Sequence, residues 1–179
     1  MQMEKIKVHD KTFVPYLSEQ EIQQQIKKMA AAINTDYAGL RPMFIAILNG
    51  SFMFASDLFK SISIDAEICF IKLASYKGTS STGNVITSIG LDEPLLNRHV
   101  VIIEDIVDTG NTLEKLAEIL ISKKVKSFKI ATAFFKPSAY TKKLKVDYVG
   151  IEIPNDFVVG YGLDYDGYGR NLKDVFVLA

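Results

Sequence analysis

The chain has little cysteine and no excess of charge of either sign. Its single cysteine, Cys69, cannot form an internal disulfide, which is typical of a reducing compartment. Lysine plus arginine and aspartate plus glutamate are both 21, so the net charge is zero. This balance argues against nucleic-acid or membrane partners, because no global field draws the chain to an anionic surface. Any anion site must therefore be local.

Long apolar runs and targeting segments are also missing. No stretch approaches the ~18 uninterrupted apolar residues that a membrane-spanning helix needs. The opening MQMEKIKVHD has no apolar region of the signal-peptide kind. We find no repeat, low-complexity tract or linker. With 179 residues, 48% of them hydrophobic, the sequence predicts one globular domain over 1–179 in the cytoplasm.

What is present is an alternation of apolar strands and amphipathic helices. Ser18 and Glu21 form a capping-box pattern that predicts the start of the first helix. Strand–turn–helix units follow at 43–60 and at 99–121. This order predicts an α/β fold with a parallel sheet covered on both faces, whose ligands bind beyond the carboxyl ends of the strands. Further strands are predicted at 67–74, 127–135, 147–153 and 174–179.

The stretch VVIIEDIVDTGNTL, residues 100–113, sets three carboxylates beside a glycine turn. A helix beginning near Thr109 would point its unpaired amides into the turn, and Gly110 would let the backbone approach a monophosphate. The pattern is neither the Gly-Lys-Ser/Thr P-loop nor the dinucleotide G-x-G-x-x-G. Glu104 and Asp105 can accept hydrogen bonds from a vicinal diol such as that of ribose, and they can hold magnesium through its waters.

A plain surface turn with Thr109 as a helix cap explains the threonine but not the three acids. The stretch instead resembles the phosphoribosyl-pyrophosphate signature of the type I phosphoribosyltransferases: four hydrophobic residues, two acids, two hydrophobic residues and D-T-G-x-T. The resemblance implies that Glu104 and Asp105 bind the ribose and that Asp108 is catalytic. It implies a 5′-phosphate site formed by Asp108, Thr109, Gly110, Asn111 and Thr112.

Five motifs in order extend the resemblance to the hypoxanthine and hypoxanthine-guanine phosphoribosyltransferases over nearly the whole chain. They are LNGS, LASYKGTSSTG, the signature, FFKPSAY and DFVVGYGLDY. The implied architecture is the type I phosphoribosyltransferase fold, a central, mainly parallel sheet flanked by helices. A small hood, built from the N-terminal segment and about 153–179, would cover the active site at the carboxyl ends of the strands. A flexible catalytic loop would span about 75–88.

The resemblance implies a purine pocket. Phe157 would stack on one face of the base, and Ile106 would close the other. Lys136 would meet the exocyclic O6, and main-chain groups around Val158 would read the remaining edge. The alternatives are a buried strand for Phe157 and Val158 and a solvated surface lysine for Lys136.

The resemblance also implies that the side of the active site that binds pyrophosphate holds Mg²⁺. Asp164 matches the family aspartate that helps to hold the metal, with Glu104 and Asp105 as further ligands, while Asp166 has no matching role. A cation is needed there because the leaving group carries several negative charges. The implied pyrophosphate-binding set is Asn49, Gly50, Ser51, Ser75, Tyr76 and Arg170.

The sequence departs from the family pattern at Asn49, where the family often has lysine. The resemblance further implies a cis bond between Leu48 and Asn49. Ser75 and Tyr76 would open the catalytic loop, a lid that excludes water from the reaction. For residues 77–81 an idle polar loop is the alternative.

The implied reaction is Mg²⁺-dependent transfer of 5-phosphoribosyl from phosphoribosyl pyrophosphate to N9 of hypoxanthine, and also of guanine, giving IMP or GMP and pyrophosphate. Alternatives are a xanthine- or guanine-preferring transferase and a regulator of the same fold that senses phosphoribosyl pyrophosphate. Such a regulator needs a basic nucleic-acid face, which zero net charge does not favour. The family usually forms homodimers or homotetramers. We expect Cys69 to be a core thiol and expect His9 and His99, outside every motif, to lie at the surface or at a strand edge.

Overall fold

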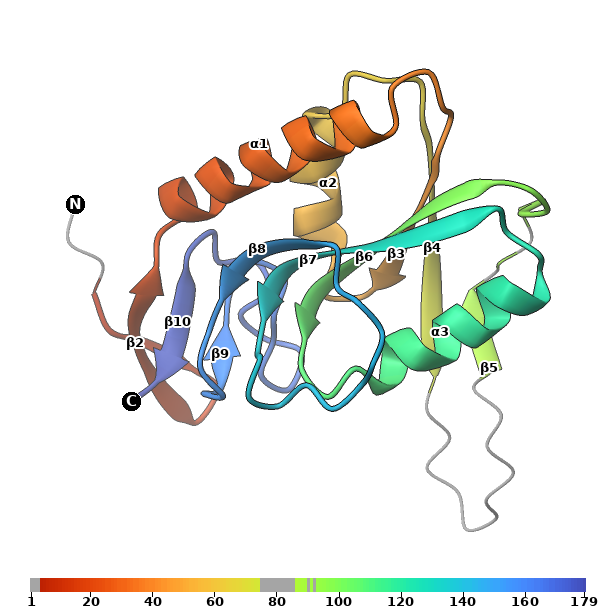
Figure 1. Ribbon diagram of the computed structural model, residues 1–179. Coiled ribbons are helices and arrows are strands. Elements are labelled where there is room, and N and C mark those ends of the chain that lie inside the picture. Colours follow the sequence, from red (N-terminus) through yellow and green to blue (C-terminus); the bar gives the residue numbers. More distant parts are fainter. Residues whose placement is uncertain (1–3, 75–85, 90, 92) are drawn as a thin grey trace, which may run out of the picture.

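The computed structural model describes residues 4–74, 86–89, 91 and 93–179. Within these ranges the chain forms a six-stranded sheet with helices on both faces and a separate four-stranded sheet (Figure 1). The predicted loop residues Ser75 and Tyr76 lie outside the described residues. Residues 86–88, which we assigned to the same loop, belong to strand β5 (Ile86–Ile89).

The larger sheet has the order β5-β4-β3-β6-β7-β8. Five of its strands are parallel, and β5 pairs with β4 in the antiparallel direction. Strand β3 is apolar throughout, and residues 100–103 of the neighbouring strand β6 are apolar as well, as expected for strands buried on both faces. The predicted bounds are confirmed for three of the parallel strands and shift by one or two residues for the others. The parallel strands are β3 (Met43–Leu48), β4 (Glu67–Ala74), β6 (His99–Val107), β7 (Ser127–Phe135) and β8 (Tyr148–Glu152).

Helices cover both faces of this sheet (Figure 1). On one face lie α1 (Glu19–Asp36) and α2 (Phe52–Lys60), and on the other lies α3 (Asn111–Ser122). The predicted capping box of Ser18 and Glu21 is present at the start of α1. No helix among the described residues is long and apolar enough to cross a membrane.

The smaller, antiparallel sheet joins the two ends of the described chain, in the order β1-β2-β10-β9. Figure 1 shows it on the side where the arrowheads of β6, β7 and β8 end. The sequence did not indicate β1 and β2, because β1 has only three residues and the partly exposed β2 contains Pro15. That this sheet acts as a hood stays a prediction. Its strands are β1 (Ile6–Val8), β2 (Lys11–Leu17), β9 (Val158–Val159) and β10 (Val175–Leu178).

Cys69 lies in β4 and is partly buried. Burial, with a smaller contribution from Glu93 and Glu67, raises the pKa of its thiol to about 11. Because the thiolate is the reactive form, we predict that the native thiol reacts with a disulfide reagent at pH 8 about a hundredfold more slowly than the same thiol in denaturant. Equal rates in the two conditions would contradict this expectation.

Candidate active site

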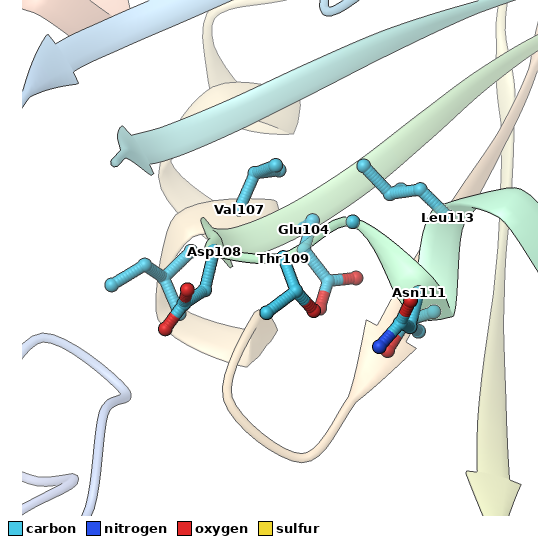
Figure 2. A pocket seen from close by; sticks show the side chains of 9 residues that line it. Glu104, Val107, Asp108, Thr109, Asn111 and Leu113 are labelled. Atoms are coloured by element: carbon cyan, nitrogen blue, oxygen red, sulfur yellow. The ribbon is translucent and has the colours of Figure 1, made fainter. Parts of the chain in front are cut away.

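The turn between β6 and α3 lines a hollow of about 310 Å³ that is open to solvent. Figure 2 shows the side chains of Glu104, Asp108, Thr109 and Asn111 projecting to one side of this turn. The residues predicted to meet the sugar and the 5′-phosphate are thus brought together, except that Asp105 is not part of the wall. The hollow is lined by Glu104, Ile106, Val107, Asp108, Thr109, Gly110, Asn111, Thr112 and Leu113.

Gly110 allows the turn to form the start of α3. Its φ is +82°, and a Cβ at this position would collide with the ring of Tyr140 and the stem of Lys142. The amide of Glu114 donates to the Gly110 carbonyl at 3.0 Å, whereas the amides before Glu114 in the first turn have no partner within a helix. The hydroxyl of Thr141 donates to the carbonyl of Thr109 at 3.4 Å. The segment 140–142 therefore supports the turn, a role that sequence analysis did not assign to it.

Glu104 and Asp105 form an acid pair with little solvation. Oε2 of Glu104 is buried without a hydrogen-bond partner in the described part of the chain. Burial, and then the charge of Asp105, raise the pKa of Glu104 well above its ordinary value. Burial also raises the pKa of Asp105 to about 6, against the opposing effects of nearby amides and Arg170. An unpaired buried oxygen costs about 1–3 kcal/mol, so this pair favours a hydroxyl donor or a cation as its partner.

Asp105 also lies directly against the turn between β3 and α2. A Cβ on Gly50 would overlap the Asp105 carboxylate, and a Cβ on Gly162 would overlap the Gly50 carbonyl. Two glycines therefore bring the end of β6, the β3–α2 turn and the loop around Gly162 into contact. The Leu48–Asn49 bond in this turn is cis, as the resemblance implied.

The anion contacts of the predicted pyrophosphate loop stay a prediction. Ser51 is 0% exposed, and its hydroxyl donates to the Ile47 carbonyl at 2.6 Å, so its side chain holds the turn, and the predicted contact with an anion rests on main-chain amides. Gly50 is buried as well, whereas Asn49 is exposed. Burial of a small loop by its neighbours depends on tertiary packing, which the motif alone does not contain.

Arg170 and Asp164 form an ion pair beside this turn. Nη2 of Arg170 lies 2.6 Å from Oδ1 of Asp164, and Nη1 donates to the Gly162 carbonyl at 2.7 Å. Oδ2 of Asp164 accepts from the amide of Gly167 at 2.7 Å. The predicted metal ligand and the predicted pyrophosphate ligand are therefore partners of one another.

The predicted metal ligands do not make a preformed cage. In the part of the chain that the structure describes, no three His, Cys, Asp or Glu residues lie close enough to hold a metal ion together. Mg²⁺ is commonly held by one or two carboxylates together with waters and substrate phosphates. The unpaired oxygen of Glu104 fits that mode of binding.

Lys136, which is predicted to bind the purine, is an ion-pair partner of Asp108 in the β6–α3 turn. It is 7% exposed, so the solvated-lysine alternative is wrong, and its Nζ lies 3.7 Å from Oδ2 of Asp108. Phe157 is 44% exposed and meets the ring of Tyr165 edge to face at 5.8 Å between centroids. Val158 is buried in β9, as the strand alternative predicted, whereas Phe157 is not buried.

A second hollow of about 850 Å³ adjoins the first. The two share Glu104, Asn111 and Thr112 in their walls. The second is also lined by Lys115, an exposed cation that follows the first turn of α3 and to which sequence analysis assigned no role. The motif ends before this position, so no sequence signal marked it.

The chain is similar over most of its length to phosphoribosyltransferases. The family model of the phosphoribosyl transferase domain matches residues 15–166. The chain is 42% identical to the hypoxanthine-guanine phosphoribosyltransferase of Bacillus subtilis, over 90% of this chain and 91% of that protein. It is 45% identical to the enzyme of that name from Staphylococcus epidermidis, with the same coverage.

A solved structure shows the same similarity at the level of the fold. The crystal structure of a hypoxanthine phosphoribosyltransferase from Staphylococcus aureus superposes with a TM-score of 0.87 at 42% identity, covering 93% of this chain and 91% of that chain. The predicted fold class is thereby confirmed. The chain belongs to the phosphoribosyltransferase family, among the hypoxanthine-guanine phosphoribosyltransferases, and is an enzyme of the transferase class.

The contact between Gly50 and Asp105 predicts the effect of a single methyl group. Gly50→Ala places a Cβ inside the Asp105 carboxylate, and we expect the free energy of unfolding in urea to fall by about 1–3 kcal/mol, with loss of activity. Gly39→Ala is the control, because its φ is +73° but its Cβ would meet nothing within 4 Å. That variant should lose about 1 kcal/mol and keep its activity. Equal activity of the two variants would contradict the contact.

The raised pKa of Asp105 predicts how stability depends on pH. Between its ordinary value near 4 and about 6, the folded state holds a proton that the unfolded state has lost, so this carboxyl lowers stability as pH rises. Asp105→Asn removes that effect. We expect the variant's stability, measured by urea unfolding without ligand, to gain about 2–3 kcal/mol relative to wild type from pH 4 to pH 7. A constant difference over that range would contradict the raised pKa.

Proposed function

We propose that the enzyme transfers the 5-phosphoribosyl group of phosphoribosyl pyrophosphate to N9 of hypoxanthine or guanine, in a purine-salvage reaction that requires Mg²⁺. The products are IMP or GMP and pyrophosphate. The observation that carries the proposal is the β6–α3 turn, where one hollow is lined both by the start of a helix and by Glu104, whose buried Oε2 has no hydrogen-bond partner among the described residues. The names of the relatives support the choice of base.

The sugar and its phosphate occupy different parts of this turn in our proposal. Glu104 and Asp105 accept hydrogen bonds from the ribose hydroxyls, which would give the orphaned oxygen of Glu104 a donor. The 5′-phosphate binds the first-turn amides of α3, with the hydroxyls of Thr109 and Thr112 as further donors. The predicted 5′-phosphate contacts with Asp108, Gly110 and Asn111 belong to the same assignment.

The base lies next to Asp108. Lys136, 3.7 Å from that carboxylate, meets the O6 of the purine, and Asp108 takes the proton near N7. Phe157, half-exposed on the side of the smaller sheet, is available for stacking on one face of the base, and Ile106 closes the other. Main-chain groups at Val158 read the remaining edge.

The pyrophosphate leaves on the side of Arg170 and Asn49. Bond breaking between the anomeric carbon and the pyrophosphate oxygen runs ahead of bond formation to N9. Mg²⁺, when bound, neutralises the charge that builds up on the leaving group. Asp164 with Glu104 and Asp105 would hold it, each as one of few protein ligands beside phosphate oxygens and waters. Arg170 offers a fixed cation, and the exposed amide side chain of Asn49 offers a donor where the family often has lysine.

The choice of base separates this proposal from its rival. A xanthine- or guanine-preferring transferase would differ in how the pocket treats the C2 position, for which we assign no side chain.

A homodimer or homotetramer and a cytoplasmic location stay predictions from the sequence.

The direct test is pyrophosphate release with hypoxanthine, guanine, xanthine and adenine, each with Mg²⁺ and with excess chelator. We expect release with the first two bases, little with xanthine or adenine, and none in chelator. Release with xanthine above that with hypoxanthine would favour the rival. Absence of release with every base would overturn the proposed activity.

Asp108→Asn tests the proposed proton acceptor. The amide keeps the shape of the side chain but cannot take a proton, so kcat should fall about 10²- to 10⁴-fold while KM for both substrates changes much less. Asp166→Asn is the matched control, since Asp166 has a positive φ that asparagine tolerates and no proposed role. Steady-state kinetics with hypoxanthine provide the measurement, and a wild-type kcat in Asp108→Asn would remove this residue from the role.

A further inference from the structure

Tyr161 is a buried phenol in the loop that leads to Arg170. The residue is 1% exposed, and its hydroxyl donates a hydrogen bond of 2.7 Å to Oδ2 of Asp57 on α2. Its ring meets that of Phe134 edge to face, with 6.2 Å between the centroids. A substrate has almost no surface of this side chain to reach, so any role in the reaction must act through neighbouring residues.

The Asp57 carboxylate has three donors from three segments. Besides Tyr161, it accepts a short hydrogen bond from the side-chain amide of Gln23 on α1, and Nζ of Lys60 lies 2.7 Å from its Oδ1. Burial alone would raise the pKa of Asp57, but the hydrogen bonds from Lys60, Tyr161 and Gln23 outweigh it and lower the pKa. Asp57 is therefore an ionised acceptor that ties α1, α2 and the loop of Tyr161 together.

Both ends of this hydrogen bond lead directly to the pyrophosphate side of the site. The helix that carries Asp57 begins directly after the turn that contains Gly50. Tyr161 is followed by Gly162, which packs against the Gly50 carbonyl. The amide of Gly162 donates to the Arg170 carbonyl at 3.0 Å, and the Arg170 guanidinium donates back to the Gly162 carbonyl at 2.7 Å. The turn and the arginine are thus held against one another through Gly162.

We propose that Asp57 and Tyr161 are positioning residues for pyrophosphate binding: their hydrogen bond keeps the Gly162–Arg170 loop seated on the β3–α2 turn. The proposal rests on the proposed function, because it assigns Arg170 and Asn49 to the leaving group. Without the bond, the loop retains its chain connections but loses the contact with α2 that sets the position of the guanidinium. Binding of the 5′-phosphate at the β6–α3 turn does not depend on it.

A second tyrosine provides a matched control for a purely structural role. The hydroxyl of Tyr148 donates to Oδ2 of Asp36 at 2.6 Å, which is the same chemistry. Asp36 is the last residue of α1, and Tyr148 is the first residue of β8. This pair therefore lies at the amino edge of the parallel strands, away from the site. A loss of folding stability alone would affect both variants alike.

The experiment compares Tyr161→Phe with Tyr148→Phe in the full chain. We expect Tyr161→Phe to raise two constants about tenfold: KM for phosphoribosyl pyrophosphate, and Kd for pyrophosphate measured by calorimetry with Mg²⁺. Loss of one hydrogen bond to a charged group changes an equilibrium constant by a factor of that order. Its Kd for IMP, which lacks the pyrophosphate, should stay within about twofold of wild type. Tyr148→Phe should keep all three values. Arg170→Gln should lose little further affinity for pyrophosphate when Tyr161→Phe is added to it.

Each outcome decides the inference. Equal pyrophosphate affinity in wild type and Tyr161→Phe, or an equal loss in both phenylalanine variants, would overturn the positioning role. Neither result would contradict the proposed function. If wild type releases no pyrophosphate with any base, the proposed function fails, and the calorimetric comparison still decides whether the bond positions an anion site. Where Tyr161→Phe does not fold, Asp57→Asn, which keeps an acceptor oxygen but removes the charge, takes its place with the same expected shifts.

Discussion

The contact of the Asp105 carboxylate with the backbone of Gly50 determines how the site is assembled. β3 and β6 are parallel neighbours, and Ala46 pairs with Ile103, so both strands end at the same edge of the sheet. The absence of a side chain at Gly50 lets the carboxylate lie on the turn, and the absence of one at Gly162 lets a third segment close over the Gly50 carbonyl. Three stretches that are far apart in sequence are thereby packed against one another.

This packing explains how three carboxylates can lie beside the proposed 5′-phosphate site in the β6–α3 turn. Asp105 faces the β3–α2 turn, Glu104 lines the hollow with a buried oxygen, and Asp108 lies beside Lys136. The start of α3 completes the same hollow. In our proposal the acids bind hydroxyls, a metal and the base, whereas the amides bind the phosphate. One turn therefore holds acceptors for donor groups and a cation, and donors for an anion.

The sequence was informative where one element determines the structure. The apolar runs predicted the bounds of β3, β4 and β7, and the Ser18 capping box predicted the start of α1, because strand length and helix capping are local properties. The signature located the hollow for the same reason: its residues lie on one turn. The packing of Gly50 could not be predicted, because Gly50 meets Asp105 and the loop around Gly162, which lies more than a hundred residues later. The links of Tyr161 to Asp57 and of Lys142 to the Gly110 turn likewise join distant segments.

In our proposal, the acids and the amides of one turn bind different parts of the same nucleotide. A crystal structure of the enzyme with IMP tests it most directly. We expect the 5′-phosphate within hydrogen-bond distance of the first-turn amides of α3 and the ribose hydroxyls within that distance of Glu104 and Asp105. A phosphate seated at Arg170, or a ribose that leaves both carboxylates without a donor, would contradict it.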